Sequence, residues 1–229
     1  MLRNYPKAYE ADRADALRVM NVSRETTERL DIFVEILDRW SQITNLVSAK
    51  AWPSLWTRHI LDCAQINEHL TPGHMWADLG GGAGFPGIVV ALINSSPTNE
   101  LSHIIESDQR KAAFLTEAAR ITEARVIIHS RRIEHVLHEL PWSLGAIISR
   151  AVAPLHQLTS WSKLHIDSGA TGLFLKGAKV QMEIEAIRDL ERYVIDLLPS
   201  RSSTTGYLCR VRRRQHLQPV NTVTGECRP

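Results

Sequence analysis

The chain has 229 residues, of which 44% are hydrophobic and 23% charged, with 27 Lys and Arg against 25 Asp and Glu. This composition indicates one folded domain, or one domain with a short extension, and it excludes wholesale disorder. The three cysteines lie far apart without a C-x-x-C pair, which argues against a disulfide framework and a structural zinc site. Charged residues throughout the N-terminal segment, and the lack of any apolar run near the roughly 20 residues that span a bilayer, exclude a secretory signal and a membrane span. We therefore expect a cytoplasmic protein with no membrane association.

Residues 1–73 are predicted to form an N-terminal helical extension. One apolar stripe recurs there at helical spacing, through Leu30, Phe33, Val34, Leu37 and Trp40. Ser23 is the expected N-cap of this helix. A second helix is expected from about Ser54 to about Leu70, because Thr71-Pro72-Gly73 ends it.

From residue 74 onward, short apolar strands alternate with helical stretches. The expected strands are Met75–Leu79, Leu101–Glu106, Arg125–His129, Leu144–Ser149 and Leu173–Lys176. The expected helices are Gly87–Asn94, Gln109–Arg120, Ile133–Leu140, Pro154–His165 and Ala178–Leu190. Alternation of this kind predicts an α/β fold, a mostly parallel sheet covered on both faces. Two last runs with no helix between them, Tyr193–Leu198 and Tyr207–Val211, predict an antiparallel pair at the edge. The domain is expected over residues 74–215, with a C-terminal tail over 216–229.

A glycine-rich segment follows the first expected strand, over residues 80–87. Glycines at a strand-to-helix turn let the backbone bend sharply and approach a ligand closely. Gly82, Gly84 and Gly87 also match the spacing of the dinucleotide-binding fingerprint, although a match of that length is weak by itself. The context favours a nucleotide site over a turn without a ligand.

Two acidic residues indicate which nucleotide. Asp78 stands directly before the glycines, where a carboxylate repels a pyrophosphate and suits a ligand with an ammonium group. Glu106 ends the second strand, where an acid can accept hydrogen bonds from a ribose diol. The two acids and the loop together describe a site for an adenosine that carries an amino acid. S-adenosyl-L-methionine (SAM) fits that description better than NAD.

Six segments carry a resemblance to a known family. They are residues 39–48 (RWSQITNLVS), 58–63 (RHILDC), 78–87 (DLGGGAGFPG), 106–115 (ESDQRKAAFL), 149–155 (SRAVAPL) and 175–177 (LKG). In this order the chain resembles the bacterial 16S rRNA guanine-N7 methyltransferases, the RsmG family, also called GidB. The resemblance implies a class I methyltransferase (Rossmann-like) fold, SAM as cofactor, and methylation of one guanine of small-subunit rRNA near the decoding centre. Cys63 stands where the family usually has Ser.

The resemblance and the loop together give the expected site residues. The cofactor-binding residues are Asp78, Gly80, Gly82, Gly84, Phe85, Glu106, Ile133, Glu134 and Arg150. The RNA-binding residues from the family-specific segments are Arg58, His59 and Lys176. No metal-site pattern accompanies the histidines, so no metal is expected.

The chemistry of guanine N7 limits what catalysis requires. N7 carries an unprotonated lone pair, so its methylation needs no general base, and orientation of the two reactants can supply most of the catalysis. No residue is therefore assigned as catalytic. In A-form RNA the N7 edge lies in a deep, narrow groove, so the target must be unpaired, flipped or exposed in an assembly intermediate. The expected partner is small-subunit rRNA or a ribosomal subunit assembly intermediate, and the expected protein is a monomer.

The C-terminal end is basic. Residues 200–229 hold six arginines and one acidic residue. Arg210, Arg212 and Arg214 alternate along the last expected strand, which puts them on one face, and we predict that they contact RNA phosphates. A solvated tail is the alternative. For the whole chain, two other functions stay open: an RNA-binding or ribosome-assembly factor without catalysis, and an NAD-dependent Rossmann oxidoreductase.

Overall fold

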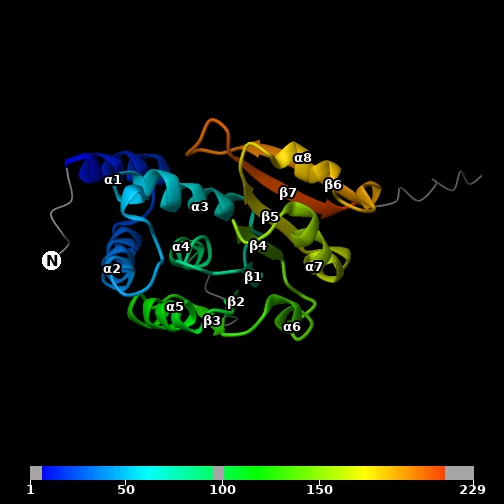
Figure 1. The fold of residues 1–229 in the computed structure, drawn as a ribbon, viewed down its shortest axis with the longest axis horizontal. Coiled ribbons are helices and arrows are strands. Elements are labelled where there is room, and N and C mark those ends of the chain that lie inside the picture. The colour runs from blue at the N-terminus through cyan, green and yellow to red at the C-terminus, as the bar shows by residue number, and fades with distance from the viewer. Residues whose placement is uncertain (1–6, 95–100, 215–229) are drawn as a thin grey trace, which may run out of the picture.

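The computed structural model describes residues 7–94 and 101–214, so the tail predicted over 216–229 lies outside the described residues. The described part contains one seven-stranded sheet of order β3-β2-β1-β4-β5-β7-β6 (Figure 1). Its strands are β1 (Trp76–Leu79), β2 (Ser102–Ile105), β3 (Val126–His129), β4 (Ala146–Arg150), β5 (Thr171–Lys176), β6 (Tyr193–Pro199) and β7 (Tyr207–Arg213). The first five strands pair in parallel, and β6 and β7 form the antiparallel edge. The predicted fold class is confirmed.

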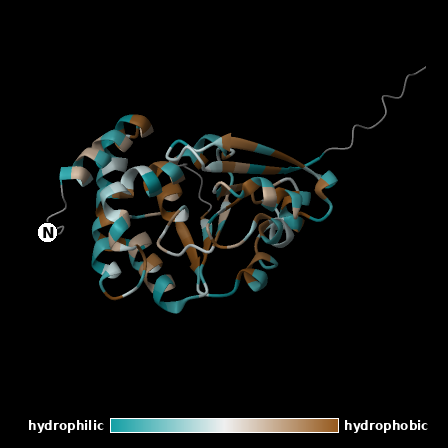
Figure 2. Cartoon of the chain, turned by 45° about the horizontal axis from the view of Figure 1, so that its top comes forward, coloured by the Kyte–Doolittle hydropathy of each residue, from teal (hydrophilic) through white to brown (hydrophobic). Residues whose placement is uncertain are grey.

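Helices cover both faces of this sheet (Figure 1). On one face lie α2 (Arg24–Ser41), α4 (Gly87–Ile93) and α5 (Gln109–Ile121). On the other lie α6 (Ile133–Leu137), α7 (Leu155–Asp167) and α8 (Val180–Glu185). Figure 2 shows hydrophobic ribbon concentrated in the central strands, while the surrounding helices alternate between hydrophobic and hydrophilic residues.

The strands are apolar on both sides because each side belongs to a core. In β1, Trp76 packs into the core under α2, α4 and α5, whereas Ala77 and Leu79 pack into the core under α6 and α7. Ile104 and Ile105 of β2 divide in the same way. Adjacent residues of a strand point to opposite faces, so a sheet buried on both sides needs continuous apolar runs.

The first predicted helix of the N-terminal region, α2, forms as expected. Ser23 caps α2, and its Oγ accepts a hydrogen bond from the backbone N–H of Thr26 at 3.1 Å. An additional helix, α1 (Lys7–Met20), precedes it and packs on the segment 49–61. Leu30 and Phe33 of α2 are fully buried in the same core as Trp76 of the sheet. The N-terminal extension is therefore an integral layer of the core.

The second predicted helix differs from the prediction in kind. It begins earlier, at Ala49, and consists of short 3₁₀, π and α turns, including α3 (Asp62–Ala64), up to His69. Pro53 cannot donate the backbone hydrogen bond that a regular helix needs. In addition, the carboxylate of Asp12 accepts from the N–H of Trp56 at 2.8 Å. This irregular segment carries Arg58, His59 and Asp62.

Candidate active site

A cavity of about 610 Å³ opens at the carboxyl ends of the parallel strands. Ligands of doubly wound sheets bind at this edge, because loops after several strands converge there. Seven of the nine predicted cofactor residues line it: Gly80, Gly82, Phe85, Glu106, Ile133, Glu134 and Arg150. The volume lies within the usual range of small-molecule sites, roughly 300–1,000 Å³.

The glycine loop between β1 and α4 has left-handed backbone at three of its positions. Gly80, Gly82 and Gly84 have φ of +77°, +51° and +84°. A Cβ at Gly84 would lie 2.9 Å from Cζ of Phe33, whereas a Cβ at Gly82 would meet nothing closer than 3.7 Å. Gly84 is thus required by packing against α2 and does not line the cavity, while Gly82 faces open space at the cavity. The two glycines serve different purposes.

Asp78 is fully buried beneath the loop and does not line the cavity. Its Oδ2 accepts a hydrogen bond from the N–H of Gly87 at 2.9 Å, and its Oδ1 has no hydrogen-bond partner. Burial, with the nearby carboxylate of Glu106 as a lesser cause, raises the pKa of Asp78 to about 8. The position of Asp78 favours holding the start of α4 over the predicted direct contact with a ligand.

Glu106 lies at the end of β2 with 9% of its surface exposed and faces the cavity. Its Oε2 accepts from the N–H of Gly82 at 2.9 Å, and its Oε1 accepts from the N–H of Asp108 at 2.8 Å. Each carboxylate oxygen can accept a second hydrogen bond. The carboxylate is therefore fixed in place and still able to accept from a diol.

Three side chains that line the cavity pack together, from His59, Phe85 and Arg150. The His59 and Phe85 ring centroids lie 5.1 Å apart, and the Arg150 guanidinium lies 6.0 Å from the Phe85 centroid. Burial, followed by the positive charges of Arg150 and Arg58, lowers the pKa of His59 to about 3. His59 was predicted to contact RNA; here it is a neutral imidazole in the wall of the cavity.

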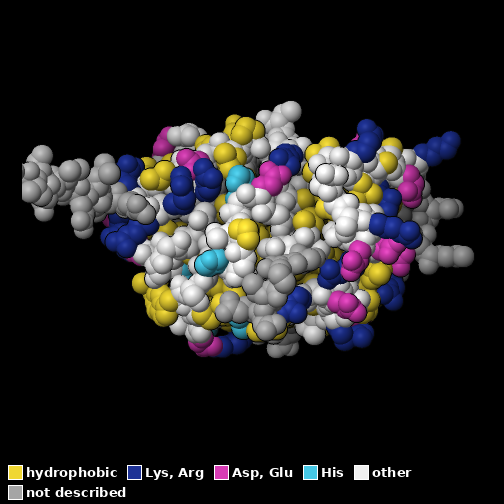
Figure 3. All heavy atoms as spheres, turned by 180° about the vertical axis from the view of Figure 1, so that it is seen from behind, with side chains coloured by type: hydrophobic (Ala, Val, Ile, Leu, Met, Phe, Trp, Pro, Cys, Tyr) yellow, Lys and Arg dark blue, Asp and Glu magenta, His cyan; other side chains and the backbone are white. Residues whose placement is uncertain are grey.

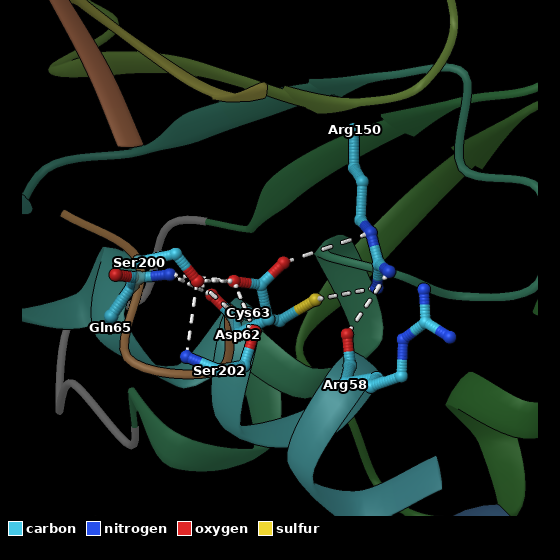
Figure 4. A network of polar contacts seen from close by, with 7 residues as sticks. All are labelled: Arg58, Asp62, Cys63, Gln65, Arg150, Ser200 and Ser202. Carbon is cyan, nitrogen blue, oxygen red and sulfur yellow. Dashed lines mark hydrogen bonds and ion pairs between the residues drawn. The ribbon is translucent and has the colours of Figure 1, made fainter. Parts of the chain in front are cut away.

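Arg150 is held by the N-terminal region as well as by the sheet. Figure 4 shows its guanidinium directed toward the segment that carries Arg58, Asp62 and Cys63. Its Nη2 donates to the carbonyl of Arg58 at 3.1 Å, and its Nη1 lies 3.9 Å from Sγ of Cys63. Burial raises the pKa of Cys63 to about 12, so the thiol is a neutral acceptor.

The other predicted RNA residues divide into two groups. Arg58 is exposed beside His59, at the same edge as the cavity. Lys176 has only 8% of its side chain exposed, and its Nζ pairs with Glu183 at 2.6 Å and donates to the carbonyl of Ala153 at 3.0 Å. This arrangement does not favour the RNA contact predicted for Lys176, because the ammonium is already bound within the protein.

The C-terminal arginines lie toward the amino ends of the parallel strands, opposite to the cavity. Arg210 pairs with Leu173 and Val211 with Gly172, so β7 runs toward the start of β5, away from the glycine loop. In Figure 3, several Lys and Arg side chains gather at the left-hand end, where β7 finishes. Arg210 and Arg212 share the face predicted for them, since both donate to Oδ2 of Asp196 at 2.9 Å. Arg214 donates instead to the backbone carbonyls of residues 191 and 193.

Several residues that line the cavity were not predicted from the sequence. They are Lys111, Arg132, Val152, Gln157 and Trp161. Arg132 directly precedes the predicted Ile133, and Lys111 lies in the first turn of the helix after Glu106, so the positions after each strand carried a usable signal. Gln157 and Trp161 come from α7, and only the packing of that helix brings them to the cavity.

Within residues 7–94 and 101–214, no three His, Cys, Asp or Glu side chains cluster so as to hold a metal ion. Over the same described residues, no helix is long and apolar enough to cross a membrane.

Comparison with known proteins identifies the family. The family described as GidB, rRNA small subunit methyltransferase G, matches residues 26–223. The ribosomal RNA small subunit methyltransferase G of Methylobacterium radiotolerans is 41% identical over 202 residues, which cover 88% of this chain and 95% of that protein. The chain belongs to this family. It is a SAM-dependent rRNA methyltransferase, as predicted, and the NAD-dependent alternative is excluded.

Two solved structures have a fold similar to that of this chain. The cofactor-bound structure of Rv0187 from MTB aligns with a TM-score of 0.58 at 12% identity, covering 93% of this chain and all of that one (100%). MtNAS in complex with S-adenosylmethionine aligns with a TM-score of 0.53 at 12% identity, covering 90% of this chain and 88% of that one. At such identity the likeness concerns the fold alone.

Proposed function

We propose that this methyltransferase transfers the methyl group of SAM to N7 of one guanine of small-subunit rRNA near the decoding centre, in the cytoplasm. The proposal joins the family membership to the chemistry of the cavity. When bound, SAM supplies a methyl group activated by its sulfonium. The residues of the chain bind and orient the two reactants.

The order of the strands lays the predicted cofactor residues out in one row. Across β3-β2-β1-β4 the cavity presents Ile133 and Glu134, then Glu106, then the glycine loop, then Arg150. An apolar side chain beside an acid suits an adenine, a fixed carboxylate suits a ribose diol, and a guanidinium suits the carboxylate of an amino acid. This row is the observation that carries the proposal, because it matches an adenosine with an attached amino acid from end to end.

The backbone at Gly82 also leaves room for a ligand. Its N–H is bound to Glu106 and its missing side chain leaves open space, so a Cβ there would occupy room that a ligand needs. Gly80 sits against Val152, where a Cβ would approach Cγ2 to 2.4 Å. The loop therefore closes on the protein at Gly80 and Gly84 and stays open at Gly82.

The chemistry proposed for the acceptor needs orientation only. His59 is neutral at any pH near 7, since its pKa is about 3, and both oxygens of Glu106 are bound to backbone N–H groups. These groups fix positions around the transfer. Effective molarities of well-oriented reactants reach roughly 10⁵–10⁸ M, which is ample for a displacement at an activated methyl group.

The RNA is proposed to approach across the edge that carries Arg58. This exposed guanidinium lies next to His59, and Lys111 and Arg132 line the cavity from the other side. Phosphates on either side of an extruded guanine would meet these cations. The substrate is proposed to be small-subunit rRNA or a subunit assembly intermediate, and the active protein a monomer.

Methyl transfer in vitro tests the proposal. The purified protein is incubated with methyl-labelled SAM and small subunits, or free small-subunit rRNA, from cells that lack it, and the RNA is digested to nucleosides. The expected result is one labelled nucleoside, 7-methylguanosine, from one of the two substrates. Label in another nucleoside or in large-subunit rRNA would overturn the proposal. Stable subunit binding without label would support an assembly factor instead.

A further inference from the structure

Asp62 lies beside the guanidinium of Arg150 (Figure 4) and does not line the cavity. Its Oδ2 is 3.9 Å from Nε of Arg150, and the two side chains are 14% and 20% exposed. This distance exceeds that of a direct hydrogen bond, roughly 2.7–3.2 Å. The carboxylate thus attracts the guanidinium without occupying its N–H donors.

The other oxygen of Asp62 is fixed by the nearby Gln65 and by one distant loop. Its Oδ1 accepts hydrogen bonds from Nε2 of Gln65 at 2.9 Å and from Oγ of Ser200 and of Ser202, both at 2.8 Å. The two serines belong to the β6–β7 loop, which the N–H of Ser200 closes by donating to the carbonyl of Gly206 at 2.9 Å. Figure 4 shows these groups converging on Asp62 from the side away from Arg150.

We infer that Asp62 is a positioning residue: with the β6–β7 loop behind it, it holds Arg150 in the orientation that receives the carboxylate of the cofactor. The inference rests on the proposed role of Arg150. An unrestrained arginine side chain loses conformational entropy when it binds a ligand. A fixed counter-charge orders the side chain before binding, so the entropy lost on binding is smaller. The C-terminal hairpin thereby acts on a cavity that it does not line.

Nearby charges agree with this assignment. The guanidinium of Arg150 has five N–H donors, of which one goes to the Arg58 carbonyl and one to the thiol of Cys63, so donors remain for a ligand. Arg58 adds a second positive charge, and His59 stays neutral. Asp62 is the carboxylate that pairs with Arg150, so removal of its charge alters the field that Arg150 experiences.

The test compares the wild type, Asp62→Asn, Arg150→Gln and the double variant by calorimetry. The probes are S-adenosylhomocysteine, which carries the amino acid, and 5′-methylthioadenosine, which does not. Asparagine keeps an acceptor oxygen for the serines and removes only the charge. We expect Asp62→Asn to bind S-adenosylhomocysteine about threefold to tenfold more weakly, and 5′-methylthioadenosine unchanged. The double variant should bind no more weakly than Arg150→Gln alone.

Additive losses in the double variant, or equal losses for both probes, would overturn the inference, because Asp62 would then act independently of Arg150. If Arg150→Gln itself leaves S-adenosylhomocysteine binding unchanged, the proposed role of Arg150 fails, and the inference fails with it. If Arg150→Gln weakens binding and Asp62→Asn does not, only the role of Asp62 fails.

Two further variants keep the test decisive. Asp31→Asn removes another partly exposed carboxylate, which binds Nε of Arg13 at 2.8 Å, and should leave both affinities unchanged. If Asp62→Asn does not fold, Ser200→Ala combined with Ser202→Ala removes two of the donors that hold Asp62. This pair should weaken S-adenosylhomocysteine about twofold and spare 5′-methylthioadenosine; unchanged binding of both would overturn the role of the loop.

Discussion

Arginines at the two ends of the parallel strands have different surroundings: the carboxyl edge carries Arg150, and the amino edge carries Arg210 and Arg212. At the carboxyl edge, Arg150 lies 3.9 Å from the carboxylate of Asp62 and faces a cavity. At the amino edge, Arg210 and Arg212 both bond directly to Asp196 at 2.9 Å. The carboxylate beside Arg150 lies too far away to accept a hydrogen bond from it, whereas Asp196 accepts one hydrogen bond from each of Arg210 and Arg212 and so offsets part of their charge directly. The two groups of arginines therefore differ in how directly a carboxylate offsets their charge.

The largest effect is expected within the glycine loop. Gly84→Val places a branched Cβ against Phe33 at a φ of +84°, so we expect the free energy of unfolding to fall by about 3 kcal/mol or more. Urea denaturation measures it. A fall of that size would assign Gly84 to packing against Phe33.

Gly82→Ala is the matched control. Its Cβ meets no protein atom closer than 3.7 Å, so only the left-handed backbone is penalised, by about 1 kcal/mol. We expect this variant to fold and to bind S-adenosylhomocysteine about tenfold more weakly. Equal stability losses in Gly82→Ala and Gly84→Val would contradict the division of the loop.

Asp78 should make stability depend on pH. Its pKa of about 8 in the fold lies above the value of about 3.9 expected in the unfolded chain, so its stabilising contribution is complete below pH 4 and is lost as the pH rises to 8. Asp78→Asn removes this titration. Relative to the wild type, the variant should gain stability steadily between pH 4 and 8, as urea denaturation at several pH values will report. A constant difference over that range would mean that Asp78 does not carry the proton.

Glu106→Ala should weaken the cofactor. Loss of a charged acceptor costs on the order of 1.5–3 kcal/mol, about 10-fold to 150-fold in affinity for S-adenosylhomocysteine. The same change releases the N–H of Gly82, so part of this loss comes through the loop. Calorimetry measures the affinity for S-adenosylhomocysteine, and a separate assay measures the affinity for rRNA. Weaker cofactor binding with unchanged rRNA binding would assign Glu106 to the cofactor. Normal cofactor binding with lost rRNA binding would contradict that assignment.

The smallest effect concerns the amino edge. Replacing Arg210, Arg212 and Arg214 by Gln should flatten the salt dependence of rRNA affinity by about one phosphate contact, roughly 0.7–0.9 log units of slope, because Asp196 offsets part of their charge. Arg58→Gln alone should reduce the slope of the salt dependence by as much, since Arg58 is exposed at the cavity edge. Parallel salt lines for the triple variant would leave the amino edge without an RNA role.

The fold could be predicted almost completely from periodicity. Apolar runs separated by amphipathic segments locate all seven strands, and the absence of a helix between the last two predicts their antiparallel pairing. The irregular turns of segment 49–69 were not predicted, and one contact within it, from the N–H of Trp56 to Asp12, joins residues 44 positions apart.

The site was predictable where residues follow strand ends, and not where packing selects them. Glu106 and Arg150 stand at strand ends and line the cavity, as the topology requires. Asp78 and Lys176 stand at equally suggestive positions, yet each is buried against a partner, Gly87 or Glu183. Burial of a charged side chain depends on contacts between distant segments, which a local pattern does not contain.

One measurement tests the central claim most directly. Small-subunit rRNA from cells with and without the gene is treated with borohydride and aniline, which cleave the chain at 7-methylguanine, and the cut positions are mapped. The account predicts one cut near the decoding centre that vanishes without the protein, returns with the wild-type chain, and is weaker with Glu106→Ala than with the wild-type chain. An unchanged cleavage pattern in cells that lack the protein would contradict it.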